Sequence, residues 1–157
     1  MAGVALSCGI LVLNVHGELL LCHATGTLRW DIPKGGGDVG ETELQVAIRE
    51  TAEETGLKFE PESLLDLGRF SYRRGKDLHL YAALIERIDT AQCVCTTRFR
   101  DSYGRLRPEM DAFEWVALVR VAERCGKSMA ALLMQRISLP SVSQQLMNLK
   151  AAGGPYF

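Results

Sequence analysis

Three glutamates, Glu50, Glu53 and Glu54, lie within five residues of the segment RETAEETG, residues 49–56. At helical spacings of three and four residues their side chains are neighbours, and like charges so placed repel. Arg49 is the only basic residue in the segment. A hard cation such as Mg²⁺ takes carboxylate oxygens together with substrate phosphates, so it would convert the repulsion into binding. The alternative is an ordinary solvated acidic face of a helix.

The loop before these glutamates reads Pro33-Lys34-Gly35-Gly36-Gly37. Glycines let the backbone approach phosphate oxygens closely, and Lys34 can contact such oxygens as a point charge. The order of the residues differs from the G-x-x-x-x-G-K-[ST] of a P-loop. For the glycines alone, a flexible linker is the alternative interpretation. The loop and the glutamates together predict a metal-dependent site for a chain of phosphates.

A helix over residues 43–55 is needed to bring the glutamates together. Thr42 and Gln45 have the spacing of a capping box at its start, and Gly56 is a stop signal at its end. On a helical wheel, Glu50 and Glu54 lie opposite the expected packing face, with Glu53 beside them. That packing face consists of Leu44, Ala47, Ile48, Thr51 and Thr55, with Ala52 next to it.

Strands and helices elsewhere in the chain must carry this loop and helix. Apolar runs separated by turn signals predict strands, and longer apolar-periodic stretches predict helices. The mixture predicts an α/β fold in which helices cover a mixed sheet. The expected strands are two within residues 4–24 turning at 15–17, a hairpin within 69–87 turning at 74–77, and residues 92–100 and 112–118, and the expected helices are 128–137 and 141–150.

Length, charge and cysteine content limit the classes of function. The 157 residues suit one domain, residues 1–157, in which about 151–157 form a mobile tail. The net charge of −1 gives no global basic field to recruit nucleic acid, and no apolar run approaches the roughly 20 residues of a membrane helix. Five cysteines without disulfide-framework spacing indicate a reducing cytoplasm. Cys93 and Cys95 are interpreted as small buried thiols on one face of a strand.

Residues 35–57, GGGDVGETELQVAIRETAEETGL, resemble the signature of the Nudix hydrolases, G-x5-E-x7-R-E-U-x-E-E-x-G-U, in which U is a bulky apolar residue. Seven fixed identities at about one in fifteen each arise by chance roughly once in 10⁸ starts. Thr51 departs from U at one position, and because threonine can pack we expect little consequence. The matching residues are Gly35, Glu41, Arg49, Glu50, Glu53, Glu54 and Gly56, with Leu57 at the last U.

The resemblance implies a Nudix-like α/β/α sandwich with a mixed β-sheet between helices. It also implies hydrolysis of a nucleoside diphosphate linked to another group, by water attack on phosphorus with Mg²⁺, or Mn²⁺ in its place. Glu53, Glu54 and the Gly35 carbonyl would bind the metal, and Glu50 would bind metal or act as the general base.

Two further positions of the signature have supporting roles in this comparison. Arg49 would orient a glutamate through a charge-assisted hydrogen bond, so it belongs with Glu50 and Glu53 in the catalytic group. Glu41 would connect the glycine-rich loop to the helix.

A further carboxylate is expected from a later loop, because family members often place one shortly before a strand with an aromatic residue. PEMDAFEWV fits this pattern, so Glu109, six residues before Trp115, is the expected additional metal ligand, with Asp111 in reserve. The alternative for Glu109 is a solvated loop residue.

The substrate is less closely defined by the sequence. WDIPKGG, residues 30–36, resembles the same segment in dinucleoside tetraphosphate hydrolases and in relatives acting on diphosphoinositol phosphates. Lys34 therefore favours a long phosphate chain, with Tyr72, His79 and Tyr81 as the contacts expected for a small nucleotide or polyphosphate.

Several interpretations of substrate and assembly stay open. The basic patch formed by Arg98, Arg100, Arg105 and Arg107 could serve RNA 5′ ends or keep a loop soluble, although the net charge does not favour nucleic acid. An oxidised or ordinary nucleoside triphosphate could be the substrate instead, or the chain could be a non-catalytic module that binds a nucleotide. A homodimer through the sheet or the C-terminal helices is also open.

Overall fold

The computed structural model describes residues 3–153. Its centre is a mixed sheet in the order β3-β2-β1-β6-β5, with β4 paired to β1 and β9 paired to β2. β1 and β6 are parallel from Ala5↔Lys76 to Asn14↔Ile85, and the other pairs are antiparallel. The strands of this sheet are β1 (Ala5–Asn14), β2 (Glu18–Ala24), β3 (Trp30–Asp31), β4 (Lys34–Gly36), β5 (Leu65–Arg73), β6 (Lys76–Ile85) and β9 (Met110–Ala117).

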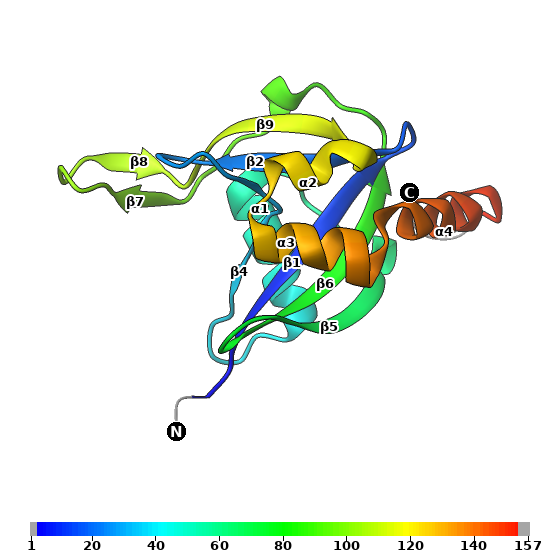
Figure 1. Cartoon of the computed structure of the whole chain (residues 1–157), viewed down its shortest axis with the longest axis horizontal. Coiled ribbons are helices and arrows are strands. Elements are labelled where there is room, and N and C mark those ends of the chain that lie inside the picture. Colours follow the sequence, from blue (N-terminus) through cyan, green and yellow to red (C-terminus); the bar gives the residue numbers. More distant parts are fainter. Residues whose placement is uncertain (1–2, 154–157) are drawn as a thin grey trace.

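Helices cover both faces of the sheet, as the α/β/α prediction requires (Figure 1). One face packs against α1 (Glu43–Thr55), and the other packs against α2 (Val121–Arg124), α3 (Lys127–Ala131) and α4 (Leu139–Ala151). A π-helical turn, Leu132–Ile137, links α3 to α4. Short 3₁₀ turns lie at Pro61–Ser63, Thr90–Gln92 and Leu118–Arg120.

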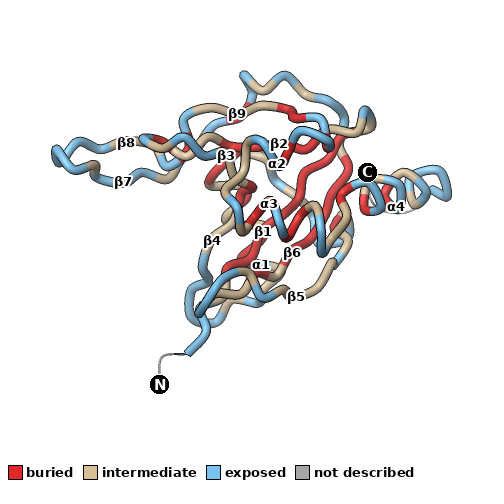
Figure 2. Tube along the Cα trace, in the orientation of Figure 1, coloured by how far each residue is buried: buried red, intermediate tan, exposed pale blue. Residues whose placement is uncertain are grey.

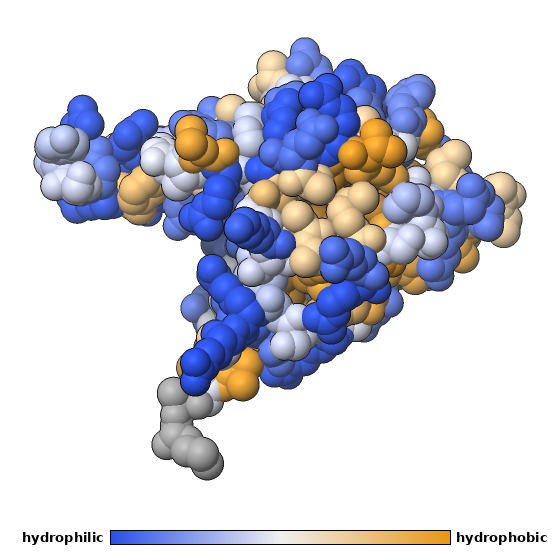
Figure 3. All heavy atoms as spheres, viewed as in Figure 1, coloured by the Kyte–Doolittle hydropathy of each residue, from blue (hydrophilic) through white to orange (hydrophobic). Residues whose placement is uncertain are grey.

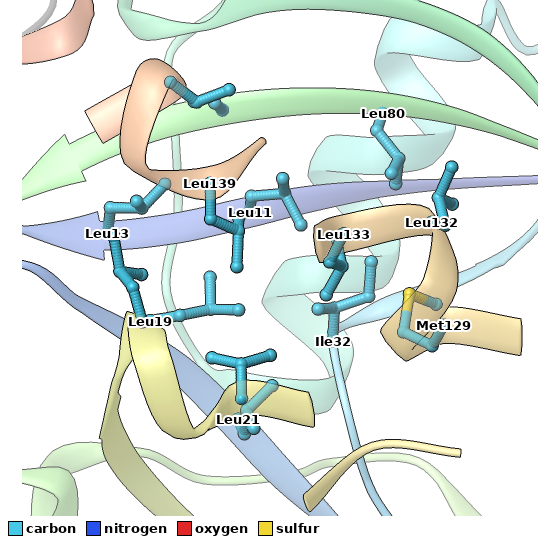
Figure 4. Packing of buried hydrophobic residues seen from close by; sticks show 14 of the residues in the cluster. Leu11, Leu13, Leu19, Leu21, Ile32, Leu80, Met129, Leu132, Leu133 and Leu139 are labelled. Carbon is cyan, nitrogen blue, oxygen red and sulfur yellow. The ribbon is translucent and has the colours of Figure 1, made fainter. Parts of the chain in front are cut away.

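The core follows the alternation of β1. Leu11 and Leu13 point to the α3–α4 face, while Ile10 and Val12 point to the α1 face, and all four are fully buried. Figure 4 shows the leucine-rich packing on the first of these faces, and Figure 2 shows the buried stretches running along β1, β2 and β6. Two packed layers hold the central strands rigidly, and β1 in turn carries β4 and the glycine-rich loop.

The helix that carries the glutamates has the predicted ends. The Thr42 hydroxyl accepts a hydrogen bond from the Gln45 amide, and the Gln45 side chain accepts one from the Thr42 amide. Gly56 ends the helix in the left-handed conformation at φ +80°. The predicted packing face is only partly right, because Val46 and Glu54 are buried as well. Glu54 therefore does not lie on a solvated side of the helix.

Two other predictions need correction. The expected strand at 92–100 is limited to β7 (Arg98–Arg100), which pairs with β8 (Leu106–Pro108) in a separate two-stranded sheet. Cys93 and Cys95 precede it in an irregular segment, so they do not share a strand face; Cys93 is buried and Cys95 is half-buried.

The tail expected at residues 151–157 is described only as far as residue 153. Of the tail expected at 151–157, Ala151 ends α4, residues 152–153 form a turn, and 154–157 lie outside the described residues. Within residues 3–153, the longest apolar helices fall short of what a membrane crossing requires.

Candidate active site

Arg49 links the glycine-rich loop to the helix. Its Nε and Nη2 donate to the two oxygens of Glu41 at 2.8 and 2.9 Å, and Nη2 also donates to the Gly36 carbonyl at 3.1 Å. These bonds from Arg49, together with one from the Asp38 amide, lower the pKa of Glu41 to about 2. The connection expected of Glu41 is therefore present.

The same guanidinium also reaches the carboxylates of the helix. Arg49 Nη1 donates to Glu50 Oε1 at 3.0 Å and to Glu53 Oε2 at 3.2 Å. One arginine thus offsets the repulsion among Glu41, Glu50 and Glu53. Burial raises the pKa of Glu50, and Arg49 opposes that shift.

Gly35 lies directly against Glu50. A Cβ built on Gly35 would come within 2.2 Å of the Glu50 carboxyl carbon and Oε2. Any side chain at residue 35 would therefore displace the carboxylate. This close approach explains physically why the signature has glycine at this position.

Glu54 is the buried member of the group, with only 2% of the residue exposed. Its Oε1 accepts the Lys34 amide at 3.2 Å, while Oε2 is buried without a hydrogen-bond partner among the described residues. Burial raises the pKa of Glu54 to about 8, opposed by the Lys34 amide and ammonium. A buried carboxylate oxygen without a partner is costly, so it indicates a ligand position.

Lys34 lies beside Glu54 but is not a free cation. Its ammonium forms an ion pair with Asp31 at 2.9 Å. Burial alone would lower the pKa of Lys34, but the charge and hydrogen bond of Asp31 raise it on balance. Asp31 was not among the residues predicted from the sequence, although its place three residues before Lys34 could have suggested the pair.

Glu109 lies close enough to α1 for its charge to act on two glutamates of that helix. Its negative charge contributes to the raised pKa of both Glu50 and Glu54. The Glu109 amide donates to the Thr97 carbonyl at 3.0 Å, which fixes the loop after β8. The reserve residue, Asp111, instead contacts His23 Nδ1 at 2.5 Å.

The three expected nucleotide contacts are not together. Tyr72 lies on the α3 side of the sheet, at the edge of a cavity of about 310 Å³. Tyr81 is 5% exposed in the core beneath α1 and is stacked by His79 at a centroid distance of 4.6 Å. His79 is held between Glu43 and Asp66 at 3.0 and 2.7 Å. We therefore keep Tyr72, whose ring centroid lies 5.1 Å from the Arg73 guanidinium, as a candidate base contact, and leave out His79 and Tyr81 because their rings stack on each other.

The carboxylates fit a hard divalent cation. The donors are all oxygens, Glu54 Oε2 has no other partner among the described residues, and the Gly35 backbone closely approaches Glu50. Within residues 3–153, no three acidic, histidine or cysteine side chains already surround one point. Arg49 holds Glu50 and Glu53 in this arrangement, so binding would require their oxygens to turn from it.

Replacing Arg49 by lysine is expected to lower the free energy of unfolding by about 1–2 kcal/mol, because one ammonium cannot reproduce the fork on Glu41. Solvent screening keeps the loss modest, since the Arg49 side chain is 29% exposed. Urea unfolding of Arg49→Lys, Glu41→Gln and the double variant measures the coupling. If the two losses of unfolding free energy were fully additive, Arg49 and Glu41 would not be coupled. That result would contradict the connection that they make between the loop and the helix.

Residues 4–136 match the family model described as NUDIX domain. The chain is 38% identical over 119 residues to the "Uncharacterized 17.7 kDa protein in e-segB intergenic region" of Enterobacteria phage T4, which covers 69% of this chain and 79% of that protein. It is 31% identical over 123 residues to the RNA pyrophosphohydrolase of Tolumonas auensis, covering 69% of this chain and 68% of that protein.

Solved structures agree with the fold. The C. elegans Ap4A hydrolase in a binary complex has a TM-score of 0.63 and 25% identity, over 92% of this chain and 99% of that chain. The NUDIX domain of Shewanella oneidensis NrtR, complexed with ADP ribose, has a TM-score of 0.66 at 17% identity, over 92% and 90% of the two chains. At that lower identity the second structure bears on the fold alone.

Proposed function

The chain belongs to the NUDIX family and is a hydrolase of phosphoric anhydride bonds, and we propose that it acts on a dinucleoside polyphosphate such as diadenosine tetraphosphate. The observation that carries the proposal is the contact of Glu54 and Glu50 with the Lys34–Gly35 backbone, with Glu53 joined to Glu50 through Arg49. A long phosphate chain supplies the anionic oxygens that a cation-loaded carboxylate cluster and a nearby lysine would bind.

In the proposed mechanism, Glu53, Glu54, Glu109 and the Gly35 carbonyl would hold a divalent cation such as Mg²⁺. When bound, it would lower the pKa of a water molecule and neutralise phosphate charge. Glu50 either adds a ligand or takes the proton of the attacking water, and burial, which raises its pKa, suits it to the second role. No covalent intermediate with the chain is needed.

The other residues of the site position these groups. Arg49 orients Glu50 and Glu53 through its hydrogen bonds to both. The Lys34 amide fixes Glu54. The Lys34 ammonium, balanced by Asp31, would contact the phosphate chain as part of a nearly neutral pair. Tyr72, at the edge of its cavity, offers a surface for a base.

Support for the first substrate comes from Lys34, the residue just before the signature, and from the similarity to a solved Ap4A hydrolase. A second candidate substrate is the triphosphorylated 5′ end of RNA. It is favoured by the relative named RNA pyrophosphohydrolase at 31% identity, and by the arginine-rich β7–β8 hairpin that precedes Glu109.

A substrate panel tests the proposal. Diadenosine tetraphosphate, ordinary and oxidised nucleoside triphosphates, ADP-ribose, NADH, diphosphoinositol phosphates and 5′-triphosphorylated RNA are each offered with Mg²⁺ and with a chelator. We expect the tetraphosphate to have the highest kcat/KM, to yield ATP and AMP, and to be inert once the cation is removed. Preference for RNA would transfer the assignment to the second candidate. Nucleotide binding without turnover of any compound would contradict the proposed enzymatic activity.

A further inference from the structure

A cavity of about 310 Å³ lies between the edge strand β5 and helix α3, on the face of the sheet opposite α1. Two of its lining side chains, Lys127 and Arg136, are cationic, and none of the lining residues that the structure describes is acidic. Tyr72 and Leu132 give the cavity apolar surface. Figure 3 shows this face, with hydrophilic and hydrophobic side chains beside one another over α3 and β5. An aromatic ring joined to an anionic group matches such walls.

Tyr72 is placed at this cavity by an irregularity in β5. The ladder pairs Ser71 with Asp77 and then Arg73 with Lys76. Tyr72 lies between these two pairs without a ladder partner among residues 76–85. Such an extra residue is a β-bulge, which bends a strand and redirects a side chain. Because β5 is an edge strand and the ladder does not hold Tyr72, the direction of this side chain depends on other contacts.

Arg136 supplies such a contact from outside the sheet. Its Nη1 donates to the carbonyl of Ser71, the residue immediately before the bulge. Its guanidinium carbon also lies 5.6 Å from the ring centroid of Phe70, which packs against the same core cluster as Tyr72. Arg136 is therefore in contact with both residues that precede Tyr72 in β5. The bulge is held in place by this arginine.

The segment that carries Arg136 is irregular as well. It belongs to the π-helical turn Leu132–Ile137, and Ser138 after the turn has φ +61°, the only positive φ of a non-glycine residue within 3–153. Leu132 and Leu133 are buried and fix the turn to the core (Figure 4). A π-helical turn and a left-handed serine both cost free energy, and such features are frequent at functional sites. One residue of a helix corresponds to about 100° of rotation, so the wider turn changes which side chain reaches β5.

Lys34 connects the cavity with the glutamates of α1. The Lys34 amide donates to Glu54 Oε1 at 3.2 Å. Tyr72 is among the groups whose charge acts on the Lys34 ammonium, so the Lys34 side chain extends toward the cavity side of the sheet. A ligand with phosphates beside Glu54 would therefore pass Lys34 and reach Tyr72 with its other end.

We propose that Arg136 is a positioning residue, which holds the β5 bulge through Ser71 and so keeps Tyr72 at the cavity. The inference rests on the proposed function and deepens it, because it assigns the cavity to a nucleoside monophosphate end of the substrate. The base stacks on Tyr72, and the phosphate pairs with Lys127. Arg136 acts through Tyr72 and does not touch the reacting atoms.

Steady-state hydrolysis of diadenosine tetraphosphate in Mg²⁺ tests this role, because it separates kcat from KM. The variants are Arg136→Ala, Arg136→Lys, Tyr72→Ala and the double variant Tyr72→Ala/Arg136→Ala. Arg120→Ala is the matched control, since Arg120 is also an exposed arginine on a short helical turn. It contacts Glu123 at 3.3 Å and is not part of the cavity lining. A thermal melt of each sample checks that the fold persists.

We expect Tyr72→Ala to raise KM about tenfold, as loss of one stacking platform does, with kcat within about threefold of the unsubstituted chain. Arg136→Ala should raise KM about five- to tenfold, because Tyr72 keeps its ring but loses its direction. Arg136→Lys should raise KM by less than about threefold, since its ammonium can still donate to the Ser71 carbonyl. The double variant should have the KM of Tyr72→Ala alone. The control should match the unsubstituted chain.

Two results would overturn the positioning role. An unchanged KM in Arg136→Ala would show that the arginine has no part in substrate binding, whatever its effect on the melting temperature. Losses that multiply in the double variant would make Arg136 an independent substrate contact, because a residue that acts only through Tyr72 has nothing to act on once that ring is removed.

The proposed function can fail separately from this inference. Binding of adenosine 5′-monophosphate in the presence of a chelator, measured by isothermal titration calorimetry, needs no turnover. If Tyr72→Ala and Arg136→Ala weaken that binding in a chain that hydrolyses no phosphoric anhydride, the proposed function is contradicted and the role of Arg136 is supported. Hydrolysis of the tetraphosphate, with equal affinity for the monophosphate in all variants or with no binding of it, would do the reverse.

Discussion

Glu53→Gln is expected to lower kcat by about 10²- to 10⁴-fold, the range found when a group that binds the metal or transfers a proton is removed. The Glu53 side chain is 34% exposed, and its hydrogen bond is to Arg49 at 3.2 Å. The amide of glutamine keeps the shape but loses the charge, so the fold should persist. Turnover of diadenosine tetraphosphate in Mg²⁺, together with a thermal melt, measures both effects.

Glu62→Gln is the matched control for Glu53→Gln. Glu62 is exposed in the 3₁₀ turn Pro61–Ser63 and makes no side-chain hydrogen bond or ion pair with the described residues. The same change of charge there should leave kcat within about a factor of two, as expected of a surface substitution that touches no substrate. Unchanged turnover by a folded Glu53→Gln variant would remove Glu53 from the site.

The helix α1, which carries the glutamates, was predictable because its signals are local. The capping box of Thr42 and Gln45, the stop at Gly56 and the i, i+3, i+4 spacing of the glutamates all act within a few residues. The Glu109 prediction also used a short spacing, to Trp115 in β9; the charge of Glu109 acts on Glu50 and Glu54, and its role as a metal ligand stays a prediction.

The burial of Glu54 could not be read from a helical wheel. The wheel gives an angle around one helix and omits the segments that cover it. Residues far away in the sequence do so here: the Lys34 amide bonds to Glu54 Oε1, and the Val94 amide donates to the Thr55 carbonyl at 2.9 Å. The Lys34–Asp31 ion pair is different, because its spacing of three residues was a local signal that could have predicted it.

The parallel pairing of β1 with β6 and the shape of the β7–β8 hairpin depend on tertiary structure, as the burial of Glu54 does. Ala5 pairs with Lys76, which is far away in the sequence, and no local sequence pattern predicts such a pairing. A strand was expected over residues 92–100, but only its exposed end, Arg98–Arg100, forms β7, and its pairing with β8 has no local signal in the sequence. The arginines of this hairpin were visible as a basic patch, but their position beside Glu109 was not.

Gly35→Ala is expected to lower kcat by about 100-fold or more, while the melting temperature changes by less than about 3 °C. The added Cβ would lie 2.2 Å from the Glu50 carboxyl carbon, so the carboxylate must move away from the reacting phosphate. That group is the far end of a flexible side chain, and the φ of Gly35 lies outside the left-handed region, so the fold can accommodate alanine. Steady-state hydrolysis and a thermal melt of the same sample provide the measurement.

Gly36→Ala separates this displacement from a general stiffening of the loop. A Cβ on Gly36 meets no atom within 4 Å, and its φ also lies outside the left-handed region. Both alanine variants lower the freedom of the unfolded chain alike, but only Gly35→Ala moves Glu50. The Gly36 variant should keep kcat within about threefold of the unsubstituted chain, since its backbone carbonyl still accepts from Arg49. If both variants remain equally active, Glu50 is not required at its observed position. If both lose activity equally, flexibility of the glycine-rich loop, rather than the placement of Glu50, limits turnover.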